Sequence, residues 1–184
     1  TFRVFSHLIR SRIYTGEILK FVLLFSGKII MEEHLMENML NEDIRKQVRE
    51  MFAEIDQPVE VLFFGTEDEA SCQYCKETSQ LLEEVTSLSD KLSLKQYDLG
   101  KDSAVASQYK VDAAPTFVLA GRDGDSVTDY AVRFKGIPAG HEFSTLVNAL
   151  VIVSKRDSGL SENTRKFLAE LTKPVKLEVF STPT

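Results

Sequence analysis

Cysteine is scarce in this sequence, with two residues in 184. A small secreted domain held together by several disulfides is excluded, because such scaffolds need a framework of cysteine pairs. Cys72 and Cys75 are separated by only two residues. A bond between them would close too short a loop to stabilise the fold through chain entropy. The pair is therefore expected to have a chemical role rather than a structural one.

An excess of positive charge and a long hydrophobic run are also missing. The net charge is −6, so no basic domain is present to neutralise nucleic-acid phosphates, and a general nucleic-acid binder is excluded. The apolar run at residues 21–25 is too short to span a bilayer. Hydrophobic and charged contents of 43% and 27% are ordinary for a soluble globular protein. No membrane association is expected for the core of the chain.

The N-terminal residues differ in composition from the rest. Residues 1–30 carry five basic residues against one glutamate, a net charge of +4, which leaves −10 on the remainder. A short apolar run after basic residues resembles a signal peptide, but no small-x-small cleavage site follows. Three methionines are candidate starts: Met31, Met36 and Met39. We hypothesise that residues 1–35 are read-through from upstream DNA, with a disordered or membrane-associated extension as the alternative.

From Asn41 onward the apolar spacing predicts alternating helices and strands. The predicted elements are a helix over 41–55, a strand over 59–64, a helix from about Cys72, a strand over 92–99, a short helix over 102–109, a strand over 117–120, a strand through 130–134 and a helix over 141–153. Asn41 and Asp102 are the predicted N-caps of their helices, and the strand through 130–134 is expected to alternate cleanly between apolar and polar residues. The order is α-β-α-β-α-β-β-α. A βαβ half followed by a ββα half is the thioredoxin topology, here with an extra leading helix. The predicted fold class is therefore α/β and thioredoxin-like.

The sequence repeats itself beyond a polar linker near Asp157. A helix over 161–171 leads into the run Pro174–Phe180, much as the helix over 41–55 leads into Pro58–Phe64. A repeat at that distance indicates domain duplication. The predicted organisation is an N-terminal extension at 1–35, a first thioredoxin-like unit at 36–155, and a linker with the first helix and strand of a second, truncated unit at 156–184.

The motif Cys72-Gln73-Tyr74-Cys75 is the predicted centre of the chemistry. At i and i+3 of a first helical turn the two side chains share a face, within reach of disulfide geometry. The positive end of the helix dipole would stabilise a thiolate at Cys72 and lower its pKa. We therefore predict Cys72 as the exposed nucleophile and Cys75 as the resolving thiol. Gln73 and Tyr74 would set the local shape and the reduction potential.

A cysteine pair can also bind zinc or be unreactive. A zinc site normally needs four ligands, and the remaining soft donors, His7, His34 and His141, have no ligand-like spacing. We predict no metal and no cofactor beyond a redox-active Cys72–Cys75 disulfide, with unreactive structural cysteines as a further alternative. The acidic run at 67–69 would disfavour a thiolate if it lay close to Cys72. A solvated acidic loop with little effect is the simpler interpretation.

A proline loop follows the next β-α unit, at Ala114-Pro115-Thr116. On sequence alone Pro115 reads as a trans turn proline, since cis is a minority state. The topology favours cis instead, because in the thioredoxin superfamily this proline is cis. There its loop packs against the cysteine pair and presents backbone groups to a substrate chain. Ala114, Pro115 and Thr116 are therefore the predicted substrate-binding residues.

These features together resemble the glutaredoxin-like protein disulfide oxidoreductases, which have two tandem thioredoxin folds. The resemblance covers roughly residues 41–184, and the extended acidic loop at 65–71 departs from the family pattern. The motifs that carry it are the Cys72–Cys75 tetrapeptide, the Ala114–Thr116 loop, and the stretches 136–143 and 180–184. It implies a cytoplasmic dithiol enzyme that acts on protein disulfides, partnered by a thioredoxin-reductase-type flavoprotein or a peroxiredoxin. It also implies a second C-x-x-C, which we expect almost immediately after Thr184.

Two other functions remain open from the sequence. One is an electron-relay domain of an alkyl hydroperoxide reductase-type flavoprotein, whose N-terminal part is also a tandem thioredoxin fold. In that part, however, the first unit typically lacks the cysteine pair. The other is a non-catalytic thioredoxin-fold docking module, against which the intact pair and Pro115 argue. The direction of electron flow cannot be read from the sequence.

Overall fold

The computed structural model describes residues 23–25, 28–30, 39–68 and 70–179. By its internal contacts the chain divides into Thr1–Glu37 and Asn38–Thr184, and each is described by itself. In the first, strands β1 (Leu23–Phe25) and β2 (Lys28–Ile30) pair in antiparallel fashion. Most of the hypothesis about residues 1–35 concerns positions outside the described residues. Within the part of the chain that is described, no helix is both long enough and apolar enough to cross a bilayer.

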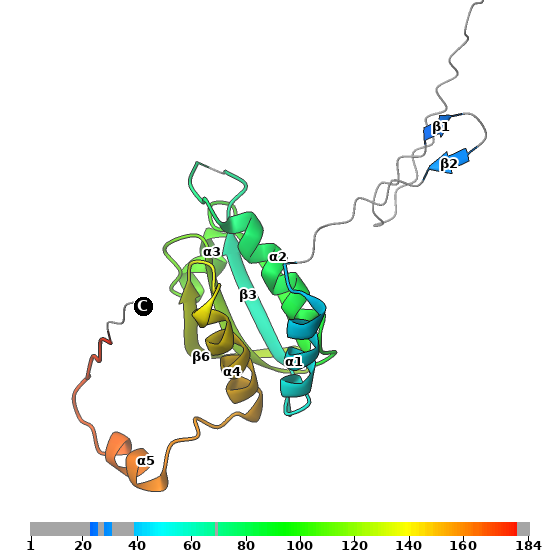
Figure 1. The fold of residues 1–184 in the computed structure, drawn as a ribbon. Helices are drawn as coiled ribbons and strands as arrows, with labels where there is room; N and C mark the ends of the chain where they lie inside the picture. The colour runs from blue at the N-terminus through cyan, green and yellow to red at the C-terminus, as the bar shows by residue number, and fades with distance from the viewer. Residues whose placement is uncertain (1–22, 26–27, 31–38, 69, 180–184) are drawn as a thin grey trace, which may run out of the picture. The chain divides into compact units, whose positions relative to one another are not determined.

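In the second part, helices and strands alternate in the predicted order (Figure 1). The elements are α1 (Glu42–Phe52), β3 (Val59–Gly65), α2 (Cys75–Thr86), β4 (Leu92–Asp98), α3 (Ser103–Gln108), β5 (Thr116–Asp123), β6 (Ser126–Lys135), α4 (His141–Lys155) and α5 (Glu162–Ala169). The β3-α2-β4 half and the β5-β6-α4 half form a thioredoxin-like fold. Helix α1 is the predicted extra leading helix, and α5 the predicted helix beyond the linker.

One four-stranded sheet, in the order β4-β3-β5-β6, organises the domain. Strand β3 runs parallel to β4 and antiparallel to β5, and β5 and β6 are antiparallel. All seven residues of β3 are buried, as expected of a strand covered on both faces. Phe63 belongs to the core cluster with side chains of α1, α2 and α4, whereas Phe64 belongs to a smaller cluster with side chains of α3. The two cysteines lie in the first cluster.

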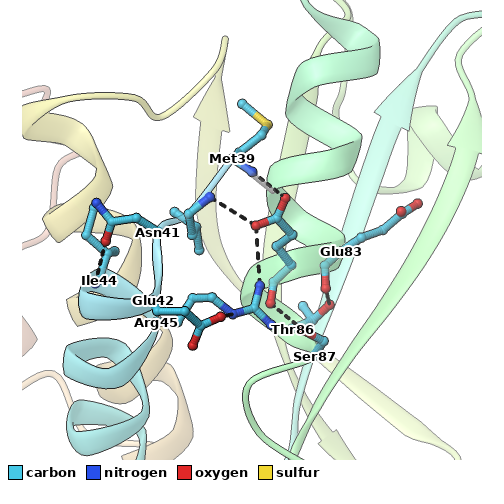
Figure 2. Close-up of polar contacts among 10 residues, drawn as sticks. Met39, Asn41, Glu42, Ile44, Arg45, Glu83, Thr86 and Ser87 are labelled. Atoms are coloured by element: carbon cyan, nitrogen blue, oxygen red, sulfur yellow. Dashed lines mark hydrogen bonds and ion pairs between the residues drawn. The ribbon is translucent and has the colours of Figure 1, made fainter. Parts of the chain in front are cut away.

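Helix α1 begins where Asn41 caps it, as predicted, with the Asn41 side chain accepting the Ile44 N–H at 2.9 Å. Its start is tied to α2 by the side chain of Glu84. Figure 2 shows these polar contacts around Met39 and Arg45. The Glu84 carboxylate accepts the N–H groups of Met39 at 2.7 Å and Leu40 at 3.1 Å, and pairs with Arg45 at 3.5 Å. Because these contacts join distant parts of the sequence, α1 is an integral part of the domain.

Three details differ from the sequence expectations. Strand β6 does not alternate cleanly: its register with β5 shifts between Leu119 and Ala120, so Tyr130 is exposed. Asp102 precedes α3 but makes no side-chain cap for it, and instead accepts the Asp98 N–H at 2.8 Å. The run beyond Pro174 forms no strand within the described residues 171–179. A strand needs a hydrogen-bonded neighbour, and the described part of the chain supplies none there.

Candidate functional site

The cysteine motif lies between the end of β3 and the start of α2. The helix begins at Cys75, with Tyr74 as its N-cap residue, so the expectation that it begins near Cys72 is corrected by one turn. Cys72 lies in the preceding turn, where its N–H donates to the Asp68 carbonyl at 3.1 Å. The first N–H groups of α2 have no side-chain cap. Uncapped N–H groups at a helix start can accept negative charge on a neighbouring atom.

Cys72 and Cys75 form a disulfide with an S–S distance of 2.01 Å and a Cα–Cα distance of 5.5 Å. Both side chains are buried, with exposed fractions of 5% and 7% respectively. The prediction that Cys72 is the exposed member is therefore wrong for this oxidised form, because both sulfurs pack into the apolar cluster with Phe63 and Phe117. What distinguishes the two cysteines is the backbone: Cys75 is inside the helix, and Cys72 is not.

The loop that carries Cys72 is shaped by Asp68. Its carboxylate accepts the Ala70 N–H at 3.1 Å and the Ser71 hydroxyl, while its carbonyl accepts the N–H groups of Ser71 and Cys72. The side chain of Asp68 is thus engaged in local turn contacts. The loop is a solvated acidic turn, which was the simpler of the two interpretations.

A second acidic residue, Glu67, is held by a cation from the β4–α3 turn. Its carboxylate meets the Lys101 ammonium at 2.9 Å, and this contact raises the pKa of Lys101. Asp98, at the end of β4, accepts the N–H groups of Lys101 and Gly100 at 2.9 and 3.0 Å. The Lys101 N–H is the main reason that the pKa of Asp98 is lowered. Glu67 is therefore ion-paired, and the Asp98 carboxylate is hydrogen-bonded to two backbone N–H groups.

A pocket of about 680 Å³ opens beside the disulfide, between α2 and β4. It is lined by both cysteines together with polar side chains, among them Gln73, Lys76, Glu77, Gln96 and Asp98. Gln96 is fixed in it, because it donates to Glu83 at 2.7 Å and accepts from Ser79 at 2.9 Å. Reactants can therefore approach the sulfur pair from this side although the cysteine side chains are buried.

Gly65 is a site residue that the sequence analysis missed. A Cβ placed on it would lie 2.7 Å from Cε1 of Phe63 and 3.4 Å from the Cys75 sulfur. The bare backbone at the end of β3 therefore leaves room for the cysteine pair and the Phe63 ring. The available signal was a glycine that ends an apolar strand immediately before the loop to a C-x-x-C motif.

The proline loop lies at the start of β5. The Ala114–Pro115 bond is cis, which confirms the prediction from the topology. Ala114 is half-buried and packs against the cluster that contains both cysteines. Thr116 is fully buried, and its hydroxyl donates to the Ala113 carbonyl at 2.7 Å. Ala114 and Pro115 are thus half-buried at the start of β5, whereas the Thr116 side chain bonds within the loop itself.

The two residues between the cysteines are on the surface, and the Tyr74 side chain is 47% exposed. Thr78, one turn into α2, is fully buried and donates its hydroxyl to the Tyr74 carbonyl at 2.6 Å. This bond fixes the backbone at the helix start while leaving the Tyr74 ring free. Among the described residues, no three His, Cys, Asp or Glu side chains are grouped to hold a metal ion.

Comparisons with known proteins point to redox proteins of this fold. The chain is 34% identical over 119 residues to the alkyl hydroperoxide reductase protein AhpF of Staphylococcus aureus, and 32% identical over 122 residues to that of Pseudomonas aeruginosa. These matches cover 64% and 66% of this chain, but only 19% and 20% of those proteins. The chain thus spans about a fifth of the length of these curated relatives. No protein-family model matches it.

Solved structures give the same picture. A protein disulfide oxidoreductase from Aeropyrum pernix matches with 34% identity and a TM-score of 0.60, over 71% of this chain and 55% of that chain. The NTD_N/C domain of AhpF from Enterococcus faecalis matches with 27% identity and a TM-score of 0.63, over 73% of this chain and 62% of that chain. The chain is therefore similar to a protein disulfide oxidoreductase and to a domain of an alkyl hydroperoxide reductase.

Proposed function

We propose that this domain catalyses thiol–disulfide exchange with disulfides of other proteins, through Cys72 and Cys75. The observation that carries the proposal is the disulfide at the uncapped start of α2, beside a pocket and beside the proline loop. A bond across three residues contributes little chain entropy to stability, so structural need does not account for it. Similarity to a protein disulfide oxidoreductase supports the same activity.

The reaction begins from the reduced dithiol. Cys72 loses its proton to solvent, and its thiolate attacks one sulfur of the substrate disulfide. The S–S bond of the substrate breaks, a mixed disulfide forms between Cys72 and the substrate, and the other substrate sulfur leaves as a thiolate. The uncapped N–H groups at the start of α2 stabilise the Cys72 thiolate before the attack.

Cys75 completes the exchange. After it loses its proton, its thiolate attacks the Cys72 sulfur, which restores the Cys72–Cys75 disulfide and releases the second substrate thiolate. Two electrons pass from the dithiol to the substrate, and the two substrate thiolates take up protons from solvent. The oxidised state that results has the connectivity found here. Running the same steps backwards oxidises a substrate dithiol.

Substrate backbone would be held by the Ala114–Pro115 loop, as the resemblance implies. Ala114 packs against the cluster that contains the sulfur pair, so a chain docked on this loop would lie within reach of Cys72. Tyr74 would add apolar contact, since its ring is exposed next to Cys75. Exposed aromatic side chains are common anchors at protein interfaces.

The experiment follows reduction of a protein disulfide substrate by dithiothreitol in the presence of catalytic amounts of the domain. Wild type is expected to accelerate the reaction, and Cys72→Ser to give only the uncatalysed rate, because no nucleophile remains. A Lys46→Gln variant, changed on the exposed face of α1, serves as a folded control. Full acceleration by Cys72→Ser would refute the proposal.

A second candidate is an electron-relay domain within an alkyl hydroperoxide reductase, favoured by the similarity to AhpF of two species. The cysteine chemistry would be the same, but the electrons would pass between a flavoprotein and a peroxiredoxin. The two functions differ in preferred partner. Reduction of a purified peroxiredoxin at least ten times faster than of a general protein disulfide would favour the relay; comparable rates would favour the general oxidoreductase.

A further inference from the structure

Some of the charged side chains that line the pocket beside the disulfide have an ion-pair or hydrogen-bond partner, and others have none among the described residues. Glu67 is paired with Lys101, and Asp98 is held by two backbone N–H groups. Asp68 is engaged in its own turn. On the proline-loop side, the apolar Ala114 and Phe117 pack in the cysteine cluster, and Asp112 is paired with Lys135 at 2.6 Å. Within the described residues, the lining charges without an ion pair or hydrogen bond are Lys76 and Glu77.

Lys76 is poorly placed for stability of the helix. It is the second residue of α2, where the positive end of the helix dipole disfavours a cation. Its exposed ammonium has no carboxylate partner among the described side chains that would offset this effect. Local features that oppose stability tend to occur at functional sites. Glu77, one residue further, has the sign that the helix start prefers.

We propose that Lys76 is a positioning residue for the reaction, resting on the exchange function above: its ammonium stabilises the Cys72 thiolate of the reduced protein and so increases the reactive fraction at neutral pH. Lys76 follows Cys75 directly and lines the same pocket as both sulfurs. When the disulfide is reduced, the thiolate supplies the negative charge that the ammonium lacks in the oxidised form. The Lys76 ammonium therefore slightly destabilises the folded protein when Cys72 and Cys75 are oxidised. When they are reduced, it stabilises the Cys72 thiolate.

The neighbouring Glu77 should act in the opposite direction. It lines the same pocket and carries the opposite charge, so removal of its charge should make the thiolate easier to form. Tyr97 also lines the pocket, and its ring stacks on that of Phe64, with 5.2 Å between the ring centroids. The pair Lys76 and Glu77 thus gives two changes of similar size whose expected effects have opposite signs.

The test measures the pH dependence of Cys72 alkylation by iodoacetamide in the reduced protein, with the Cys72 peptide quantified by mass spectrometry. Lys76→Gln should shift the midpoint upward by roughly half a unit, the size expected of one exposed charge. Glu77→Gln should shift it downward, and both shifts should shrink at high salt. Lys46→Gln, an exposed lysine of α1, should leave it unchanged.

The stability of the oxidised protein separates this role from a structural one. Lys76→Gln should leave the urea midpoint of the oxidised form unchanged or raise it, because an unfavourable charge is removed from the helix start. An unchanged alkylation midpoint, or an equal shift in Lys46→Gln, would overturn the proposal. Alkylation needs no substrate or partner, so this result stands apart from the Cys72→Ser experiment, which tests the exchange function itself.

Discussion

At the scale of single residues, the two cysteines differ by position and not by burial. Both sulfurs are buried in the oxidised form, but only Cys75 belongs to α2, and Cys72 lies in the turn before it. The uncapped N–H groups at the start of the helix therefore point back toward the turn that holds Cys72, and they can stabilise a negative charge on its sulfur. This asymmetry supports the proposal that Cys72 attacks and Cys75 resolves.

Gly65 gives a prediction at the same scale. Gly65→Ala should destabilise the oxidised domain by about 1–3 kcal/mol, because the added methyl would lie 2.7 Å from Cε1 of Phe63 in a packed core. The neighbouring contact with the Cys75 sulfur, at 3.4 Å, transmits any movement to the disulfide. Urea unfolding of the oxidised protein measures the change.

Gly100→Ala is the matched control for this substitution. A Cβ at Gly100 would meet only a carboxylate oxygen of Asp98, at 3.3 Å, near the surface. Gly100→Ala should lower the free energy of unfolding clearly less than Gly65→Ala does. Equal costs for the two variants would show that close packing at the end of β3 is not the cause.

At the scale of elements, the leading helix is held by a contact that no local pattern reveals. Glu84 of α2 is only 11% exposed in its side chain and binds two backbone N–H groups and Arg45 at the start of α1 (Figure 2). Glu84→Gln should lower the free energy of unfolding by about 1–3 kcal/mol, because an amide cannot accept from all three partners. Denaturant titration followed by circular dichroism measures it.

A glutamate on α1 itself provides the comparison. Glu50 is exposed, and no hydrogen bond or ion pair joins its side chain to other described residues. Glu50→Gln should change the free energy of unfolding by less than about 0.5 kcal/mol. If both glutamine variants lost equal stability, the tie between α1 and α2 would have no special role.

The order of the elements could be predicted from the sequence, because buried strands and amphipathic helices have distinct periodicities. The start of α2 could not, since the turn after Asp68 continues through Cys72 and delays the helix by one turn. The irregular register of β6 was also missed, because a bulge depends on the pairing strand rather than on alternation. The apolar run at 175–179 resembles a strand, yet Leu177 is 89% exposed and the run lacks a described partner.

At the scale of the whole molecule, surface carboxylates predict how stability depends on pH. The pKa of Glu54 is lowered by Lys155, that of Asp112 by Lys135, that of Asp157 by Arg165, and that of Asp98 chiefly by the Lys101 N–H. A lowered pKa in the folded state means that stability is complete above the unfolded values and is lost as pH falls through the folded ones. The ordinary values are 3.8 for aspartate and 4.5 for glutamate.

The urea midpoint of the oxidised protein should therefore stay constant from pH 7 to about 5.5 and fall steadily below about 4.5. The fall should be reduced in high salt, since these pairs are exposed and screened. A midpoint that is constant down to pH 2.5 would refute this account. A loss that begins near pH 6.5 would instead implicate histidine.

The residues of the candidate site could be predicted from the sequence, but several of the contacts among them could not. Cys72, Cys75 and the cis Pro115 follow from a motif and a topology that the sequence carries. The roles of Gly65 and Asp98 depend on how close β3 and β4 come to the loop, which is a three-dimensional fact. Thr116 was expected to bind substrate, but its side chain is buried and bonded within its own loop.

The central claim is that Cys72 attacks and Cys75 resolves, and a trapping measurement tests it most directly. Reduced Cys75→Ser is mixed with a protein disulfide, quenched with acid, and analysed by mass spectrometry under non-reducing conditions. We expect a stable mixed disulfide between Cys72 and the substrate, because the sulfur that would resolve it is absent. The matched Cys72→Ser variant should accumulate much less. A mixed disulfide that accumulates through Cys75 in Cys72→Ser, with none in Cys75→Ser, would contradict the account.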